Sequence, residues 1–366
     1  MICCVIYINK MTDILFLVGS AVGGAERMTL LYAKILKESG FNCKILVSHC
    51  PKGTPIQLKE FLPNEIPWEV IETTRVRYLP IELLKFIRRE KAKLVFCSNS
   101  QTGSIMLAFK RFHLFSSKVV VRMNTTPTRL SKNERKLGIF AFPKADAIIA
   151  QTAEMKEELI DILHLDDSMV TTIYNPLNQS LIKEKIKEVY PFDCSYVNYV
   201  AIGGVRPVKG YDTLIEAFGI AHVKQPLTRL YIVGGLAGKT EMQVYESLID
   251  KYSIKDSVFF EGMQPNPYKY TNGCSVYVLS SIKEGLPNAM LEALYLGKPV
   301  VATACIPYVK QVINDSNGIV VPVKDPQAMA EALVRASGMK DREKFIPINN
   351  TENEIINLFK SLENTK

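Results

Sequence analysis

Short runs of consecutive apolar residues alternate with longer amphipathic stretches along this chain. In the first half these runs cover residues 14–18, 43–47, 94–97, 119–122 and 146–150. In the second half they cover residues 197–202, 230–233, 258–262, 275–279, 299–302 and 318–321. Short runs that are apolar throughout are typical of strands buried on both faces, and the stretches between them are long enough for helices. The pattern predicts an α/β protein with doubly wound parallel sheets.

The length of 366 residues, of which 47% are hydrophobic, suits two domains that each bury a core. Asn175 precedes Pro176, and the residue before a proline favours extended backbone, as in a segment that crosses between domains. A charged, helix-like piece follows, so we expect the boundary near residue 180. Met1 to Lys10 precede a second methionine, Met11. We interpret them as a dispensable extension or a wrongly chosen start, with an extra edge strand as the alternative.

A net charge of +8 favours an anionic partner, which could be nucleic acid, a membrane or a substrate. Nucleic acid is the weaker explanation, because the sequence contains no helix-turn-helix, RNP-type strand or zinc-finger spacing. No apolar run reaches the roughly 18 to 20 residues of a membrane span, and no cleavable signal is evident. The eight cysteines form no CxxC pair. We interpret them as reduced, buried thiols of a cytosolic protein.

Two stretches of the first half carry clustered basic residues. The amphipathic stretch Pro80 to Lys93 gathers apolar side chains on one side and basic ones on the other. One interpretation is a solvated face above a packed one. The other is contact with an anionic membrane leaflet, where each cation contributes about 1 kcal/mol. The two clusters are Lys85, Arg88 and Arg89, and then Arg129, Lys132, Arg135 and Lys136.

The stretch Ser280 to Pro299, SSIKEGLPNAMLEALYLGKP, places two carboxylates around one predicted crevice. Glu284 lies in the loop after a strand, and Glu292 lies about one turn into a helix that begins near Pro287 or Asn288. Ligands of open α/β sheets bind at the carboxyl ends of the strands, and a helix N-terminus there suits a diphosphate. Glu292 could then accept hydrogen bonds from ribose hydroxyls. The alternative is a solvated helix face.

Two further loops follow predicted strands. Gly23 and Gly24 separate the first strand from a helix, and they form either a plain tight turn or a loop that a ligand approaches closely. Arg206 and Lys209 follow the strand of residues 197–202. Their cations could meet a phosphate in the same crevice as Glu284, or they could be ordinary solvated side chains.

These motifs together resemble retaining glycosyltransferase family 4. EGLPNAMLEALYLGKPVV is similar to the donor-site signature of that family, GGAER to its glycine turn, YNP to its interdomain linker and GGVRPVKG to its phosphate-binding element. The resemblance implies the GT-B fold, with two Rossmann-like domains that face a cleft. It implies an acceptor-binding domain at 1–180, a nucleotide-sugar-binding domain at 181–345, and a helix at 346–366 that returns to the first domain.

The resemblance also implies roles for single residues. The expected catalytic residues, which stabilise the leaving diphosphate or hold the donor sugar, are Lys209, Arg206 and Glu284. The expected donor-binding residues are Gly23, Gly24, Gly262, Met263, Gln264, Gly285, Leu286, Pro287, Asn288 and Glu292. The expected acceptor-side residues are Glu26, Arg122, Asn124 and Thr125. The chain departs from the family at Gly204, where the family has arginine, so Arg206 is expected only as a substitute.

The implied activity is retaining transfer of a hexose or N-acetylhexosamine from a nucleotide sugar, with UDP as the expected nucleotide. The expected acceptor is a saccharide or a polyprenyl-diphosphate-linked glycan, at the cytoplasmic face of the cell membrane, in polysaccharide, lipopolysaccharide or capsule biosynthesis. No cofactor and no metal are expected. The alternative is a non-catalytic GT-B subunit that binds a partner or lipid, suggested by Gly204. An epimerase or phosphorylase is disfavoured, the latter because no lysine stands in a cofactor-site context.

Overall fold

The computed structural model describes residues 11–236, 238–339, 345 and 350–364. The chain divides into two compact units, which are described separately. Unit 1 comprises Met1–Pro176 and Asn350–Lys366, and unit 2 comprises Leu177–Asn349. The first boundary therefore lies four residues before the expected position, and the segment that follows it belongs to unit 2. Residues Met1 to Lys10, interpreted above as an extension, lie outside the described residues.

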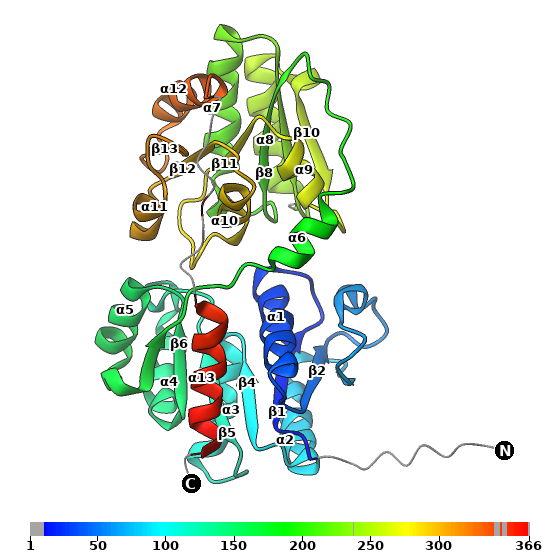
Figure 1. Ribbon diagram of the computed structural model, residues 1–366, viewed down its shortest axis with the longest axis vertical. Helices are drawn as coiled ribbons and strands as arrows, with labels where there is room; N and C mark the ends of the chain where they lie inside the picture. Colours follow the sequence, from blue (N-terminus) through cyan, green and yellow to red (C-terminus); the bar gives the residue numbers. More distant parts are fainter. Residues whose placement is uncertain (1–10, 237, 340–344, 346–349, 365–366) are drawn as a thin grey trace, which may run out of the picture. The chain divides into compact units, whose positions relative to one another are not determined.

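The described part of unit 1 is built around a seven-stranded parallel sheet with the order β3-β2-β1-β4-β5-β6-β7 (Figure 1). Its strands are β1 Ile14–Gly19, β2 Cys43–His49, β3 Trp68–Glu72, β4 Leu94–Cys97, β5 Lys118–Arg122, β6 Ala147–Ala150 and β7 Val170–Thr172. Its α-helices are α1 Gly24–Glu38, α2 Leu79–Glu90, α3 Ser100–Arg111, α4 Lys132–Ala141, α5 Ala153–Leu163 and α13 Thr351–Asn364. Short 3-10 helices cover Gln57–Phe61 (η1), Val76–Tyr78 (η2), Pro127–Arg129 (η3), Phe142–Lys144 (η4) and Asp167–Met169 (η5).

The described part of unit 2 contains a six-stranded parallel sheet with the order β10-β9-β8-β11-β12-β13. Its strands are β8 Val197–Ile202, β9 Thr228–Val233, β10 Val258–Gly262, β11 Val276–Leu279, β12 Val300–Thr303 and β13 Gly318–Val321. Its α-helices are α6 Gln179–Lys185, α7 Tyr211–Lys224, α8 Lys239–Tyr252, α9 Tyr268–Gly273, α10 Asn288–Tyr295, α11 Pro307–Val312 and α12 Pro326–Ser337. Two 3-10 helices cover Pro207–Lys209 (η6) and Lys255–Ser257 (η7).

Both faces of the unit 1 sheet are covered, which explains why its central strands are apolar throughout. Along β1, Ile14 and Phe16 point into a core shared with α1 and α13, whereas Leu15 and Leu17 point into a second core on the opposite face. Successive side chains of a strand alternate between faces, so a two-sided burial requires hydrophobic residues at every position.

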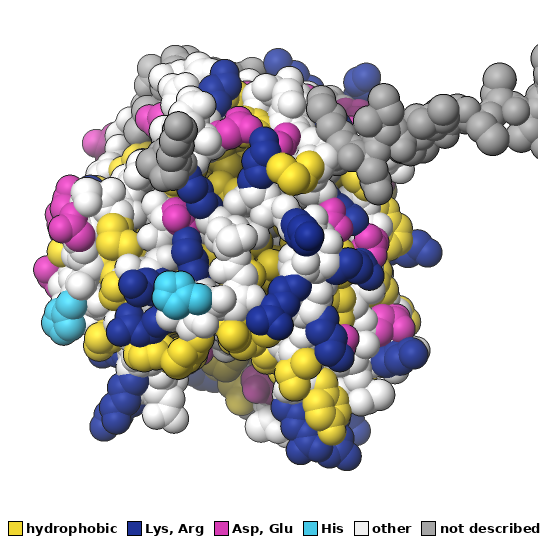
Figure 2. Space-filling model, turned by 90° about the horizontal axis from the view of Figure 1, so that it is seen from below, with side chains coloured by type: hydrophobic (Ala, Val, Ile, Leu, Met, Phe, Trp, Pro, Cys, Tyr) yellow, Lys and Arg dark blue, Asp and Glu magenta, His cyan; other side chains and the backbone are white. Residues whose placement is uncertain are grey.

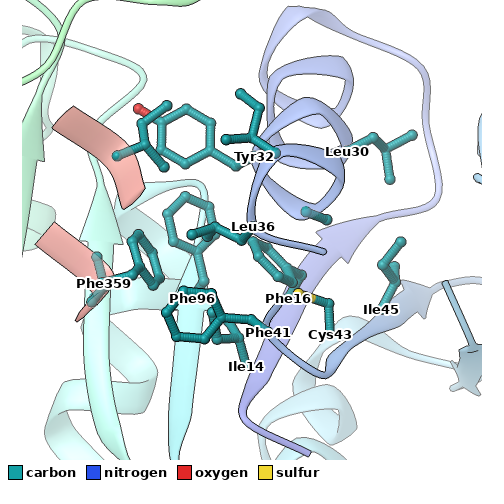
Figure 3. Packing of buried hydrophobic residues seen from close by; sticks show 14 of the residues in the cluster. Ile14, Phe16, Leu30, Tyr32, Leu36, Phe41, Cys43, Ile45, Phe96 and Phe359 are labelled. Atoms are coloured by element: carbon teal, nitrogen blue, oxygen red, sulfur yellow. The ribbon is translucent and has the colours of Figure 1, made fainter. Parts of the chain in front are cut away.

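The tail helix α13 belongs to the core of unit 1 although it follows unit 2 in the sequence. Phe359 of α13 is 1% exposed, and its ring centroid lies 6.0 Å from that of Phe96 in β4. Figure 3 shows Phe359 directed toward the aromatic group that Phe16, Tyr32 and Phe96 form. Unit 1 is therefore assembled from both ends of the chain.

Two details differ from the sequence-based expectations. Strands β3 and β7 were not anticipated. Among the described cysteines, all of which are free thiols, Cys43, Cys97 and Cys274 are buried, but Cys194 is exposed and Cys50 and Cys305 are half-buried. The expectation of uniformly buried thiols is therefore wrong. None of the described helices combines the length and the apolar composition needed to cross a membrane.

The packing of α13 predicts a stability effect that is specific to unit 1. Phe359→Ala is expected to lower the free energy of unfolding of this unit by about 3 to 5 kcal/mol, because it leaves a cavity in the core. The single tryptophan, Trp68, lies in β3 of unit 1, so its fluorescence during urea unfolding reports on this unit. The matched control is Phe112→Ala, since Phe112 is 65% exposed. Equal unfolding midpoints for both variants would show that α13 does not stabilise unit 1.

Candidate functional site

An ion pair stands at the carboxyl edge of the unit 2 sheet. The loops after β8 and β11 adjoin there because the two strands are neighbours. Lys209 donates from Nζ to Oε1 of Glu284 at 2.7 Å, and the two side chains are 25% and 13% exposed. Ser281 donates from Oγ to the same carboxylate oxygen at 2.5 Å. The structure thus brings together two of the three residues expected to be catalytic.

Backbone contacts hold the lysine loop against the glutamate loop. Gly210 has a left-handed φ of 64°, and a Cβ atom there would lie 2.2 Å from the carbonyl oxygen of Ser280. The Ser280 hydroxyl donates to the Lys209 carbonyl at 2.8 Å, and the Ile282 N–H donates to the Val208 carbonyl at 2.9 Å. Only glycine permits both this φ and this close approach. The position of Lys209 is therefore set by the packing of two loops.

Arg206 lies beside the position where the family carries its arginine. A Cβ atom built on Gly204 would be 3.6 Å from Nε of Arg206, so the Arg206 side chain folds back over Gly204. Arg206 itself is exposed. The Arg206 guanidinium therefore lies next to the position that the Cβ atom of a side chain at residue 204 would occupy.

The helix α10 begins at Asn288, with Pro287 as its N-cap residue, as the sequence predicted. Glu292 is half-buried in this helix, and the Tyr268 hydroxyl donates to its Oε1 at 3.1 Å. One expectation needs correction. The N–H groups of residues 286–288 do not all point to a ligand, because Pro287 has none and Asn288 donates to the Leu286 carbonyl at 3.0 Å.

The loop expected to contact the nucleotide base follows β10. Gly262 has a φ of 67°, and its carbonyl accepts from the Gly234 N–H at 2.8 Å. The side chain of Gln264 donates back to the Glu261 carbonyl at 2.7 Å, and Met263 is 49% exposed. The loop of residues 262–264 therefore adjoins the glycine turn after β9, on the opposite side of β8 from Glu284 and α10.

Several groups near the ion pair were not anticipated from the sequence. The Tyr211 hydroxyl donates to the Gly203 carbonyl at 3.0 Å. Burial, together with the charge of Glu284, raises the pKa of Tyr211 far above its ordinary value. The thiol of Cys305, in the loop after β12, has a pKa raised to about 12, chiefly by burial and secondly by the Glu284 carboxylate. Tyr211 begins α7 and Cys305 follows β12, and neither belongs to a motif, so the sequence alone gives no signal for them.

In unit 1 the glycine turn lies at the carboxyl end of β1. Gly23 is the N-cap residue of α1, and Gly24 is the first residue of this helix. A Cβ atom on Gly23 would lie 2.6 Å from Oε2 of Glu26, so the Glu26 carboxylate covers the turn. The three residues expected from GGAER therefore form one local structure at the N-terminus of α1.

A polar pocket of about 290 Å³ opens at the same edge of the unit 1 sheet. Asn124 and Thr125, both expected on the acceptor side, line it together with groups from α3 and α4. Gln101 donates from Nε2 to Glu134 at 3.1 Å. The Ser131 N–H, and secondly this bond from Gln101, lower the pKa of Glu134, which therefore stays ionised. The other lining residues are Asn99, Ser100, Arg129 and Leu130.

Arg122 occupies a different environment from the one expected. It is 1% exposed, donates from Nη2 to the side chain of Asn175, and lies with its guanidinium carbon 5.8 Å from the ring centroid of Tyr32. Burial lowers its pKa from the ordinary value. This burial differs from the expectation of a side chain that borders a cleft. The arginine instead anchors the last residues of the first segment of unit 1.

The environment of Cys305 predicts an unusual reactivity. Because the thiolate is the reactive form, alkylation of a thiol with a pKa of about 12 should accelerate roughly tenfold per pH unit between pH 8 and pH 10. Peptide mapping by mass spectrometry after iodoacetamide treatment measures this rate for each cysteine. At pH 8 we expect Cys305 to react more slowly than the exposed Cys194, with the difference lost in urea. Equal rates in the folded protein would contradict the burial of this thiol.

Comparison with known proteins assigns each half of the chain to a family model. Residues 22–181 match the model described as glycosyltransferase family 4, and residues 182–350 match glycosyl transferases group 1. An uncharacterized glycosyltransferase of Methanocaldococcus jannaschii is 30% identical over 65% of this chain and 61% of that protein. A relative in Campylobacter jejuni is N-acetylgalactosamine-N,N'-diacetylbacillosaminyl-diphospho-undecaprenol 4-alpha-N-acetylgalactosaminyltransferase. It is 23% identical over 87% of this chain and 88% of its own length.

The fold is also that of solved glycosyltransferase structures. The crystal structure of HepE from Anabaena in complex with UDP superposes with a TM-score of 0.73 and 17% identity, covering 96% of this chain and all of HepE. With its seven-stranded and six-stranded parallel sheets, the protein has the GT-B fold. Since the two family models together span residues 22–350, the chain belongs to glycosyltransferase family 4, the group 1 glycosyl transferases.

Proposed function

We propose that this protein is a retaining glycosyltransferase that moves a hexose or N-acetylhexosamine from a nucleotide sugar, with UDP as the nucleotide, to a lipid-linked or saccharide acceptor. The observation that carries the proposal is the Lys209–Glu284 pair beside the N-terminus of α10. The UDP complex of HepE supports the choice of nucleotide. The undecaprenol-linked name of the Campylobacter relative supports a lipid-linked acceptor in glycan biosynthesis.

The proposed chemistry depends on the charge of the leaving group. Breaking the bond between sugar and nucleotide leaves negative charge on the diphosphate, so fixed cations and a helix N-terminus near it lower the barrier. Lys209 and Arg206 supply the cations, and α10 supplies the helix N-terminus. The proposed chemistry uses no nucleophilic side chain, no metal and no cofactor.

The ion pair also suggests how the donor is recognised. Without a ligand, Lys209 and Glu284 neutralise each other at 2.7 Å. A bound diphosphate competes for the ammonium of Lys209, and the carboxylate of Glu284 then accepts hydrogen bonds from sugar hydroxyls. Glu292 holds the ribose hydroxyls in this proposal, and Tyr268 keeps its carboxylate oriented. The residues 262–264 contact the base.

The acceptor is proposed to bind at the carboxyl edge of the unit 1 sheet. The polar pocket there presents amides, hydroxyls, one cation and one carboxylate, which are the groups that recognise saccharides and phosphates. Asn124, Thr125 and Glu26 keep their expected acceptor-side roles. Arg122 contributes by positioning, because it is buried against Asn175. A lipid-linked acceptor implies action at the inner face of the cell membrane.

Nucleotide binding is the first test. Isothermal titration with UDP, GDP and ADP should show one preferred nucleotide. Lys209→Ala and Glu292→Ala should each weaken its binding by about 1.5 to 3 kcal/mol, roughly 10- to 150-fold, because each removes a charged hydrogen-bond partner. Lys255→Ala is the matched control, since Lys255 is exposed before the amino end of β10. Absence of binding to all three would favour the non-catalytic GT-B subunit instead.

The role of Glu284 is tested by separating nucleotide affinity from turnover. Glu284→Gln should lower kcat/KM for the nucleotide sugar about 10- to 150-fold through the lost charged hydrogen bonds. The affinity for the nucleoside diphosphate alone should not fall, because the sugar contacts are absent from that ligand and the variant no longer has a carboxylate that competes for Lys209. A parallel loss of kcat/KM and of nucleoside diphosphate affinity would indicate that Glu284 acts on the diphosphate and not on the sugar. Proton NMR of the anomeric centre in the product tests retention.

A further inference from the structure

One segment of unit 1 holds an unusual excess of positive charge. Between Glu90 and Asp146 the chain contains eleven lysines and arginines and a single acidic residue, Glu134. The net charge of this segment exceeds the +8 of the whole protein, so the rest of the chain has a slightly negative net charge. The segment forms β4, α3, β5 and α4. The positive charge is therefore concentrated in one segment of unit 1.

The outward face of α4 is both basic and apolar. With 3.6 residues per turn, Lys132, Lys136 and Phe140 lie on one stripe of the helix, and Leu137 and Ile139 flank it. The exposed fractions of Leu137, Ile139 and Phe140 are 39%, 40% and 40%. A solvated helix face normally carries polar residues at such positions. Large apolar side chains between lysines are typical of a surface that contacts a lipid bilayer or another molecule.

The C-terminal end of α3 extends this face. Phe112 is 65% exposed, and its ring centroid lies 6.1 Å from that of Phe140. The guanidinium carbon of Arg111 lies 4.6 Å from the Phe140 ring centroid. We call Arg111, Phe112, Lys132, Lys136, Leu137 and Phe140 the α4 surface. In the view from below (Figure 2), which faces the end of unit 1 where α13 terminates, yellow hydrophobic and dark-blue basic side chains lie next to one another.

The other basic cluster expected from the sequence has a different character. On α2, Lys85 pairs with Glu82 at 2.8 Å, and Arg89 pairs with Glu69 at 2.8 Å. Arg88 donates to the Leu114 carbonyl at 2.7 Å. These cations have partners within the protein, so of the two clusters for which the sequence left membrane contact open, the one on α4 is the stronger candidate. On α4 the lone acid, Glu134, is used in the capping box with Ser131.

We propose that the α4 surface binds an anionic lipid bilayer. Lysine and arginine side chains attract anionic headgroups, and exposed aromatic side chains enter the boundary between headgroups and acyl chains. The proposal rests on the lipid-linked acceptor proposed above. Glu134 and Arg129, at the N-terminal end of α4, line the polar pocket, so a bilayer on this face lies beside the opening proposed for the acceptor.

Vesicle flotation with the full-length protein tests the proposal. We expect binding to vesicles with about 30% phosphatidylglycerol and much weaker binding to pure phosphatidylcholine, as the electrostatic attraction to anionic lipids requires. Lys132→Gln with Lys136→Gln should lower the partition coefficient about twentyfold, since each cation contributes about fivefold. Phe112→Ser with Phe140→Ser should lower it about tenfold. The matched control, Lys85→Gln with Arg89→Gln, removes the same charge from α2 and should change binding less than about twofold.

The outcomes separate this proposal from the proposed activity. Trp68 fluorescence during urea unfolding, measured on every variant, reports whether unit 1 is folded, and nucleotide affinity reports on unit 2; both should stay unchanged. Loss of vesicle binding with both quantities intact supports the α4 surface. Equal binding to neutral and anionic vesicles, or an equal loss in the α2 control, would overturn it. So would a wild-type dimer that Phe112→Ser with Phe140→Ser converts to a monomer, since the surface would then bind a second copy.

Discussion

The geometry of the proposed donor site depends on one close backbone contact. Gly210 turns with a left-handed φ so near the Ser280 carbonyl that no side chain fits between the two loops. This contact couples the loop after β8 to the loop after β11, and the Lys209–Glu284 pair, the placement of Ser281 and the entry into α10 all follow from it. A flexible lysine on an unconstrained loop would lose side-chain freedom on binding an anion. Here the backbone brings the ammonium to its partner in advance.

Much of this site could be predicted from sequence because its parts follow strands. The apolar runs located β8, β11 and the other central strands, and the carboxyl ends of parallel strands necessarily share an edge. The EGLPN motif then placed Glu284, Pro287 and Glu292 around the start of a helix, which the structure reproduces at Asn288. Local chemistry and sheet topology were sufficient for these residues.

The remainder depends on contacts between residues that are distant in sequence. The partner of Arg122 is Asn175, and the partner of Arg89 is Glu69, so neither the burial of the first nor the neutralisation of the second is visible in a local pattern. Strand β3, with the sequence WEVIE, is short, contains two charged residues and lies at a sheet edge, where incomplete burial weakens the apolar signal. Which basic side chains find partners within the protein is likewise a tertiary property.

The contribution of α13 to the unit 1 core has a consequence for biosynthesis. A ribosome makes the first segment of unit 1 before unit 2, but Ile355, Phe359 and Leu362, which fill the core of unit 1, emerge after unit 2. Unit 2 is complete before that point and can fold as an independent domain during translation. The amino-terminal domain is thus the last to reach its native state. Until α13 has been synthesised, unit 1 exposes the apolar side chains that α13 will cover, and this nascent form is the one that chaperones would have to protect.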